Sequence, residues 1–168
     1  MEFREEIRAD NMQIDCKELM DKSGGTYILI LNLKNDRPAQ IGKLGRLTFK
    51  AGSYGYVGSA FGPGGLISRL KHHIKLSRKP HWHIDYFRRF ANPTYVWFSK
   101  KNERLEHEWA AAMYQMQHTF LPIKGFGSTD CSCISHLFYF LKQPCFHLFQ
   151  GKIKNQNLSC SNIYDYFF

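Results

Sequence analysis

The feature that most constrains the fold is a short apolar run at residues 26–33, TYILILNL, which turn-forming residues bound on both sides. Ser-Gly-Gly precedes the run at residues 23–25, and Asn-Asp-Arg-Pro follows it at residues 35–38. A run of this length, rich in Ile, Leu and Tyr and placed between two such turns, is typical of a buried β-strand. The chain must therefore build a sheet around this segment.

Three further segments predict the other strands. Residues 39–49 form an extended stretch that Gly42 and Gly45 interrupt, and residues 54–57 form another. Residues 94–99 are rich in Tyr, Val, Trp and Phe, which favour strands. We expect these segments to form a small antiparallel sheet.

Helical periodicity marks other parts of the chain. Residues 66–76 and residues 103–117 each carry an apolar stripe, and residues 81–90 also favour a helix. Residues 125–136 are loop-like, and residues 142–168 predict no clear element. The fold expected from these elements is a single α/β (α+β) sandwich with a small antiparallel β-sheet flanked by helices.

The chain divides into three parts by composition. Residues 1–24 are polar and acidic and predict an N-terminal leader. Residues 25–141 hold the predicted strands and helices and form the main domain. Residues 142–168 are expected to be a C-terminal extension packed on that domain.

Positive charge is concentrated in one middle segment. The chain carries a formal net charge of +9, and residues 66–104 hold ten Lys or Arg side chains against two acidic ones. Histidine and aromatic side chains are interleaved with them. Such a segment favours a polyanion, with nucleic acid first, because cations that neutralise phosphates release counterions. The alternative is a solvated basic face that keeps the protein in solution.

Several classes of protein are excluded. The longest uninterrupted apolar run, residues 109–114, is far shorter than the roughly 20 residues of a membrane-spanning helix. The N-terminal stretch MEFREEIRADNM lacks the apolar core of a secretory signal. The five cysteines are an odd number, which argues against a disulfide scaffold. We therefore expect a cytoplasmic protein with reduced cysteines and no membrane partner.

An ordered set of residues carries the candidate chemistry. Gly-Thr-Tyr at residues 25–27 lies on the first strand, Tyr-Val-Gly-Ser-Ala at residues 56–60 lies on a later one, Arg69 follows in a helix, and a Glu lies on a later helix. This order resembles the GIY-YIG nuclease pattern. The stretches GKLGRLTFKAGSYGYVGSAFGPGGL, HWHIDY and GFGSTDCSCISHLFY resemble the subfamily catalogued as domain of unknown function 123. The resemblance covers residues 25–139 and implies a GIY-YIG-type fold and metal-assisted hydrolysis of a phosphodiester.

Four residues are the candidate catalytic groups under this resemblance. Arg69 suits a pentacovalent phosphate, because its planar guanidinium bonds two oxygens at once. His73 lies four residues on, on the same helix face, where it could orient the water or donate to the leaving oxygen. Tyr27 and Tyr56 are expected to act as phosphate ligand and general base, or as nucleophile, and the pattern leaves open which tyrosine takes which role.

The expected metal is Mg²⁺ or Mn²⁺. A lone carboxylate with several waters suits Mg²⁺, which keeps much of its hydration shell. Glu106 and Glu108 border the apolar stripe on opposite sides, so helical geometry leaves both open, and the resemblance favours Glu106. Some relatives place Lys where this chain has Ser59. The residues expected to contact the substrate are Gly58, Ser59, Lys71, His83 and Asp85, and the alternative for His83 and Asp85 is to support the site without touching the substrate.

Cys131, Cys133 and His136, with Asp130, form an alternative set of ligands for Zn²⁺. The Cys-x-Cys-x-x-His spacing lacks the paired Cys-x-x-Cys of common structural zinc sites. We therefore expect this segment to be a loop plug that packs beside the active site, since free cysteine is commonly a small core residue.

The resulting functional hypothesis is a metal-dependent endonuclease that acts on single-stranded, double-stranded or structured DNA. Repair is the suggested pathway, because relatives of the subfamily occur joined to a base-excision glycosylase. The alternative is a non-catalytic nucleic-acid-binding module on the same scaffold, since the lysine missing at Ser59 removes one activator of Tyr56.

Overall fold

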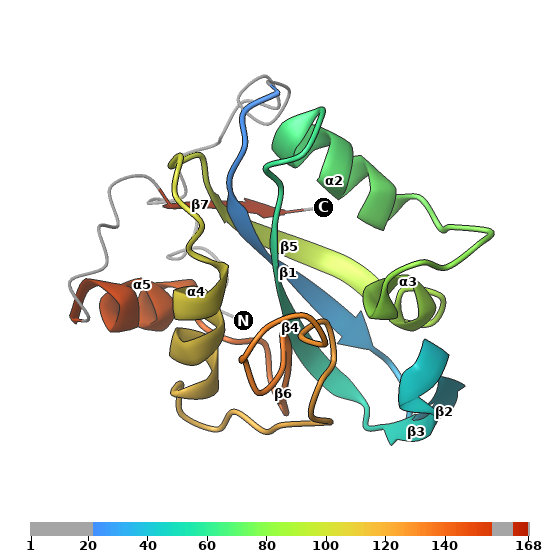
Figure 1. Cartoon of the computed structure of the whole chain (residues 1–168). Coiled ribbons are helices and arrows are strands. Elements are labelled where there is room, and N and C mark those ends of the chain that lie inside the picture. The colour runs from blue at the N-terminus through green and yellow to red at the C-terminus, as the bar shows by residue number, and fades with distance from the viewer. Residues whose placement is uncertain (1–21, 156–162, 168) are drawn as a thin grey trace.

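A computed structural model describes residues 22–155 and 163–167 of the chain, so the predicted leader lies almost wholly outside the described residues. Its centre is a five-stranded sheet in the order β6-β4-β1-β5-β7, with β1 (Thr26–Leu33) in the middle (Figure 1). All strand pairs in it are antiparallel. The other strands are β4 (Gly52–Ser59), β5 (Asn92–Ser99), β6 (Leu137–Phe140) and β7 (Ile163–Phe167).

Strand β1 is buried on both faces. Tyr27 and Leu29 belong to one apolar cluster, while Ile28 and Ile30 belong to a second. Successive side chains of a strand point to opposite faces, so alternate residues of β1 pack against the two different layers. The predicted strand at residues 26–33 is confirmed with the same bounds.

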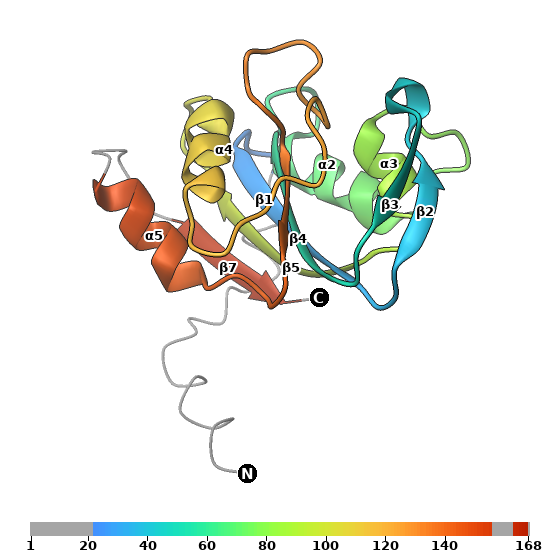
Figure 2. The same ribbon diagram turned by 90° about the horizontal axis from the view of Figure 1, so that it is seen from below.

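Helices cover both faces of the sheet (Figure 2). On one face lie α2 (Gly65–Ile74) and α3 (His83–Phe87), and on the other lie α4 (Glu106–Tyr114) and α5 (Phe146–Asn155). The predicted mixed α+β sandwich with an antiparallel sheet and flanking helices is therefore confirmed. None of the helices in the described residues is long and apolar enough to cross a membrane.

The segment at residues 39–49 differs from the prediction of one extended stretch. It folds back on itself as β2 (Arg37–Gln40), the short 3₁₀ helix η2 (Gly42–Leu44) and β3 (Arg46–Phe49), which form a separate two-stranded sheet. The reversal occurs where Gly42 and Gly45 have φ angles of 45° and 87°, a region that favours glycine. This hairpin packs beside α3 on the α2 side of the main sheet (Figure 2).

The C-terminal segment contributes to the core, although the sequence predicted no element there. Helix α5 buries Phe149 and Ile153 in the second cluster. The Phe149 ring stacks on Trp97 of β5, with ring centroids 5.3 Å apart, and meets Trp109 of α4 edge-on at 5.3 Å. Residues 146–155 therefore complete the layer over one face of the sheet.

We predict that Phe149→Ala lowers the free energy of unfolding by about 3–5 kcal/mol, because it opens a cavity between two buried tryptophans. Leu148→Ala is the matched control, since Leu148 is 62% exposed. Urea titration followed by circular dichroism measures both. Equal midpoints for the two variants would show that α5 does not stabilise the domain.

Candidate active site

Most of the candidate residues named above line one cavity of about 520 Å³ at one end of the sheet. Its walls come from β1, β4, α2, the start of α4 and the loop at residues 125–136. A second cavity, about 700 Å³, lies beside α5 and is mostly apolar. The predicted residues that line the polar cavity are Tyr27, Tyr56, Gly58, Ser59, Arg69, His73, His83, Glu106, Cys131 and His136.

Tyr27 and His73 form a buried pair. The hydroxyl of Tyr27 lies 2.6 Å from Nε2 of His73, and both residues are 2% exposed. Burial, and then the neighbouring His72, lower the pKa of His73 to about 3. Burial, and then Tyr56, raise the pKa of Tyr27 well above its usual value. Both side chains are therefore neutral at pH 7, and the hydrogen bond joins a phenol to an imidazole.

Gly58 makes room for this pair. It lies directly opposite Tyr27 in the pairing of β1 with β4. A Cβ atom at Gly58 would meet the Tyr27 hydroxyl oxygen at 2.4 Å and Cζ at 2.5 Å, which no real Cβ tolerates. The ring of Tyr27 cannot move aside, because it is buried in the core. The glycine of Tyr-x-Gly is thus a packing requirement of the tyrosine on the adjacent strand.

Tyr56 also lies next to His73. Its ring centroid is 6.0 Å from that of His73 and 6.2 Å from that of Phe126. Burial, and then the Glu106 carboxylate, raise the pKa of Tyr56, whereas Arg69 acts in the opposite direction. In the described residues the Tyr56 hydroxyl has no hydrogen-bond partner, although Tyr56 lines the cavity. It is therefore a neutral donor available to a ligand.

Arg69 reaches the cavity from α2 with one face of its guanidinium covered. Its Cζ atom lies 4.2 Å from the centre of the Trp82 ring, within cation–π distance. Stacking uses the face of the guanidinium and leaves the N–H groups at its edge free to bond oxygens. Arg69 and His73, four residues apart, reach the same cavity, as the helical spacing predicted.

Arg88 holds the end of α2 in place. Its guanidinium donates to the backbone oxygens of His73, Ile74 and Ala91, and the side chain is 7% exposed. The last carbonyls of a helix lack partners within the helix, so these bonds fix both the helix end and His73. Arg88 was one of the ten basic residues that suggested a polyanion site, and its charge serves the fold instead.

Asp85 supports the site without lining it. One oxygen accepts the backbone N–H groups of His81 and Trp82 at 2.9 and 3.0 Å, and the other lies 2.9 Å from Nε2 of His72. Burial opposes its ionisation, but these three hydrogen bonds outweigh burial and lower the pKa of Asp85. Asp85 thus shapes the turn that carries Trp82, and it does not face the cavity as a substrate contact would.

Three more of the predicted residues, Lys71, Glu108 and Cys133, also lie outside the cavity lining. Lys71 is exposed on α2, and Glu108 is exposed on α4. His83, in contrast, lines the cavity, and its Nδ1 accepts the backbone N–H of Gly127 at 3.0 Å. The proton of this imidazole is therefore on Nε2, which makes His83 a donor. Burial lowers its pKa.

Glu106 is the carboxylate that reaches the cavity from α4. Its Oε2 accepts the Ser59 hydroxyl at 2.8 Å, and its Oε1 lies 3.3 Å from Nδ1 of His136. Burial opposes ionisation, but the hydrogen bonds from His136 and Ser59 outweigh it and lower the pKa of Glu106. The start of α4 is fixed because the N–H of Leu105 donates to Oγ1 of Thr26 at 3.2 Å. Of the two candidate metal ligands, only Glu106 reaches the cavity, a choice that helical spacing alone left open.

Two groups of potential metal ligands occur in the described residues. One consists of His72, His73 and Asp85, all of which already hydrogen-bond within the site. The other adds His107 of α4 to Cys131, Cys133 and His136 of the loop. Sequence reasoning missed His107, because an exposed residue between two glutamates on a helix gives no pattern that points to the loop.

The chain is similar to one known family. Residues 26–157 match the family described as Domain of unknown function DUF123, and the chain belongs to it. The match continues past residue 141, the boundary that composition suggested, and includes α5. Neither the curated proteins nor the solved structures contain a match to this chain.

We predict that His73 stays neutral from pH 8 to pH 5, because burial lowers its pKa to about 3, far below the value of about 6.5 in an unfolded chain. The folded state therefore loses stability relative to the unfolded state as pH falls below about 6.5. Imidazole carbon shifts measure this directly by NMR, with His73→Gln assigning the resonance. A His73 resonance that titrates near pH 6.5 would contradict the buried, neutral pair with Tyr27.

Proposed function

We propose that this protein is a metal-dependent endonuclease of the GIY-YIG type that hydrolyses phosphodiester bonds in DNA. One observation carries the proposal: Tyr27, Tyr56, Arg69, His73 and Glu106 come from four separate elements and line a single cavity. Two phenols, a guanidinium, an imidazole and a carboxylate are the groups that hold a phosphate, move a proton and bind a divalent ion. Their convergence supports phosphodiester chemistry over a purely structural role.

Arg69 binds the scissile phosphate in this proposal. The contact with Trp82 holds the guanidinium at the cavity wall, so Arg69 is positioned before the substrate arrives. Additional charge develops on the phosphate oxygens as the nucleophile attacks, and two N–H donors in one plane stabilise it. Arg104, which also lines the cavity, adds a second cation at its edge.

Tyr27 and His73 accept the proton of the attacking water in this proposal. The hydroxyl oxygen of Tyr27 accepts a hydrogen from the attacking water, while its own proton is held at Nε2 of His73, 2.6 Å away. Burial lowers the pKa of His73 overall, and the Asp85 carboxylate offsets only part of that effect, so the imidazolium forms only during proton transfer. Among the described residues Tyr27 has a hydrogen-bonded base in His73 and Tyr56 has none, so Tyr56 keeps its proton and donates to a phosphate oxygen.

Glu106 fits the metal ligand of this proposal. Its carboxylate is ionised and lines the cavity, and an ionised carboxylate has about four lone-pair positions, of which Ser59 and His136 use two. When bound, Mg²⁺ or Mn²⁺ supplies positive charge against the developing charge of the phosphate. A cation on Glu106 also offsets the negative charge that raises the pKa of Tyr56.

DNA is the proposed partner, because exposed Lys71, Lys75, Arg78, Lys79 and Arg89 surround the helices that carry the site. A cytoplasmic location suits the free thiols of Cys131, Cys133 and Cys145 in the described residues. Repair is the pathway proposed from the resemblance.

We predict that the protein cleaves DNA with Mg²⁺ or Mn²⁺ and that EDTA abolishes cleavage. Arg69→Ala and Tyr27→Phe should each lower kcat by about 10²-fold or more, because each removes a group that acts on the transition state. Arg69→Lys should not restore the rate, since a point charge cannot bond two oxygens in one plane. The assay follows labelled single-stranded, double-stranded and branched DNA on a gel.

Lys154→Ala is the control for this assay, because Lys154 is exposed on α5, which contributes no residue to the cavity wall. It should cleave at the rate of the unchanged chain. Cleavage that survives both Arg69→Ala and EDTA would mean that a contaminating nuclease, or a different site, is responsible.

The second candidate is a module that binds nucleic acid without cleaving it. Burial raises the pKa of both tyrosines, and Ser59 stands where some relatives have the lysine that would oppose this effect. Such a chain would keep its phosphate contacts and lose turnover.

Under either function we predict that the affinity for DNA falls steeply as salt concentration rises, since phosphate contacts release counterions. Arg69→Ala should reduce the slope of the logarithm of the binding constant against the logarithm of the salt concentration by about 1, because one phosphate contact is lost. Tyr27→Phe should leave this slope unchanged. Fluorescence anisotropy in EDTA measures binding separately from cleavage. An affinity for DNA that does not change with salt concentration would rule out both functions.

A further inference from the structure

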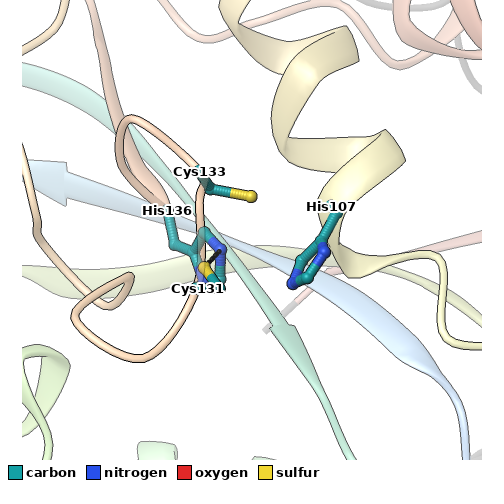
Figure 3. A group of neighbouring side chains, drawn as sticks. All are labelled: His107, Cys131, Cys133 and His136. Carbon is teal, nitrogen blue, oxygen red and sulfur yellow. Dashed lines mark hydrogen bonds between the residues drawn. The ribbon is translucent and has the colours of Figure 1, made fainter.

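The strongest feature outside the proposed phosphodiester chemistry is a cluster of two thiols and two imidazoles. His107 belongs to the first turn of α4, whereas Cys131, Cys133 and His136 belong to the loop that leads into β6 (Figure 3). One donor atom from each side chain lies within 4.8 Å of the donor atoms of the other three. Two cysteines and two histidines are a common ligand set of structural zinc sites.

The spacing of the donor atoms fits a tetrahedral ion. With Zn–S near 2.3 Å and Zn–N near 2.0–2.1 Å, sulfur and nitrogen ligands in a tetrahedron lie about 3.6 Å apart. The Sγ atom of Cys131 and Nε2 of His136 are 3.6 Å apart, so this edge is already in place. The longest distances between donor atoms need to shorten by about 1.5 Å at most to reach the tetrahedral spacing. His107 is exposed, so its side chain can change rotamer to do so.

A second observation points to the same ion. His136 is buried, and its Nδ1 faces Oε1 of Glu106 at 3.3 Å while its Nε2 faces Cys131. The carboxylate places the imidazole proton on Nδ1, which leaves the lone pair on Nε2 directed at the cluster. A carboxylate behind the outer nitrogen of a histidine is the arrangement that orients metal-binding histidines in zinc proteins.

The alternative roles of the two cysteines fit less well. The loop packs beside the cavity, as the plug prediction expects, and Cys133 contacts the second apolar cluster, but neither Cys131 nor Cys133 is fully buried. Neither thiol pairs in a disulfide in the structure. The loop at residues 125–136 has no helix or strand of its own, yet it supplies Thr129, Asp130 and Cys131 to the cavity wall.

We propose that His107, Cys131, Cys133 and His136 form a tetrahedral structural site for Zn²⁺ that fastens the loop to α4. Binding releases one proton from each thiol to solvent and forms two Zn–S and two Zn–N bonds. The site is separate from the Mg²⁺ or Mn²⁺ proposed at Glu106, because that carboxylate orients His136 and does not ligate the zinc.

Substitution by Co²⁺ tests this proposal, because tetrahedral cobalt with thiolate ligands gives strong visible bands and a sulfur-to-cobalt charge-transfer band. The full chain, purified under reducing conditions and loaded with Co²⁺ or Zn²⁺, should bind one ion per chain at this site. Cys131→Ser and Cys133→Ser should each lower the charge-transfer intensity by roughly half, and His107→Ala should shift the visible bands. Cys145→Ser is the matched control, because this exposed thiol lies outside the cluster, and it should leave the spectrum unchanged.

If a cysteine variant does not fold, the unchanged chain still provides a test. Zn²⁺ should protect Cys131 and Cys133, but not Cys145, from alkylation, as peptide mass spectrometry would show. A chain that binds no Zn²⁺, alkylates all three thiols equally, or carries a Cys131–Cys133 disulfide overturns the proposal. None of these readouts depends on nuclease activity, so failure of the endonuclease proposal leaves this one intact.

Discussion

The burial of β1 on both faces is the constraint on which the rest of the structure depends. Tyr27 faces the layer of α2 and α3, whereas its neighbour Ile28 faces the layer of α4 and α5. Because side chains alternate along a strand, a slip of one residue would exchange the two layers and carry Tyr27 away from His73. The register with β4 that places Gly58 opposite Tyr27 is therefore also what assembles the cavity.

The cavity is held together by hydrogen bonds that cross between elements distant in the chain. Ser59 of β4 and His136 of the loop both bond to Glu106, while Arg88 fixes the helix end that carries His73. These contacts join different elements of the fold, so the cavity exists only in the folded chain. The hydrogen bonds of Tyr27, His73, Ser59, Glu106 and His136 give these groups the fixed geometry that catalysis or tight binding requires, while Tyr56 and Arg69 keep donors available.

Local patterns in the sequence predicted what depends on neighbouring residues alone. The run at residues 26–33 predicted β1, and the spacing of four residues placed Arg69 and His73 on one helix face. Patterns of this kind could not separate Glu106 from Glu108, because Ser59 and His136 decide between them from other elements. The same limit concealed the fold of α5 and the position of His107, both of which are defined by distant tertiary contacts.

The stacking of Arg69 on Trp82 gives the protein an intrinsic optical probe. The chain has three tryptophans, and two of them, Trp97 and Trp109, are 1% and 0% exposed in the layer between β5, α4 and α5. Trp82 is 37% exposed and lies at the cavity. A phosphate bound to Arg69 changes the charge beside the indole, and this would alter the emission of Trp82 against a constant background from the other two tryptophans. Occupancy of the cavity could thus be followed without attaching a dye.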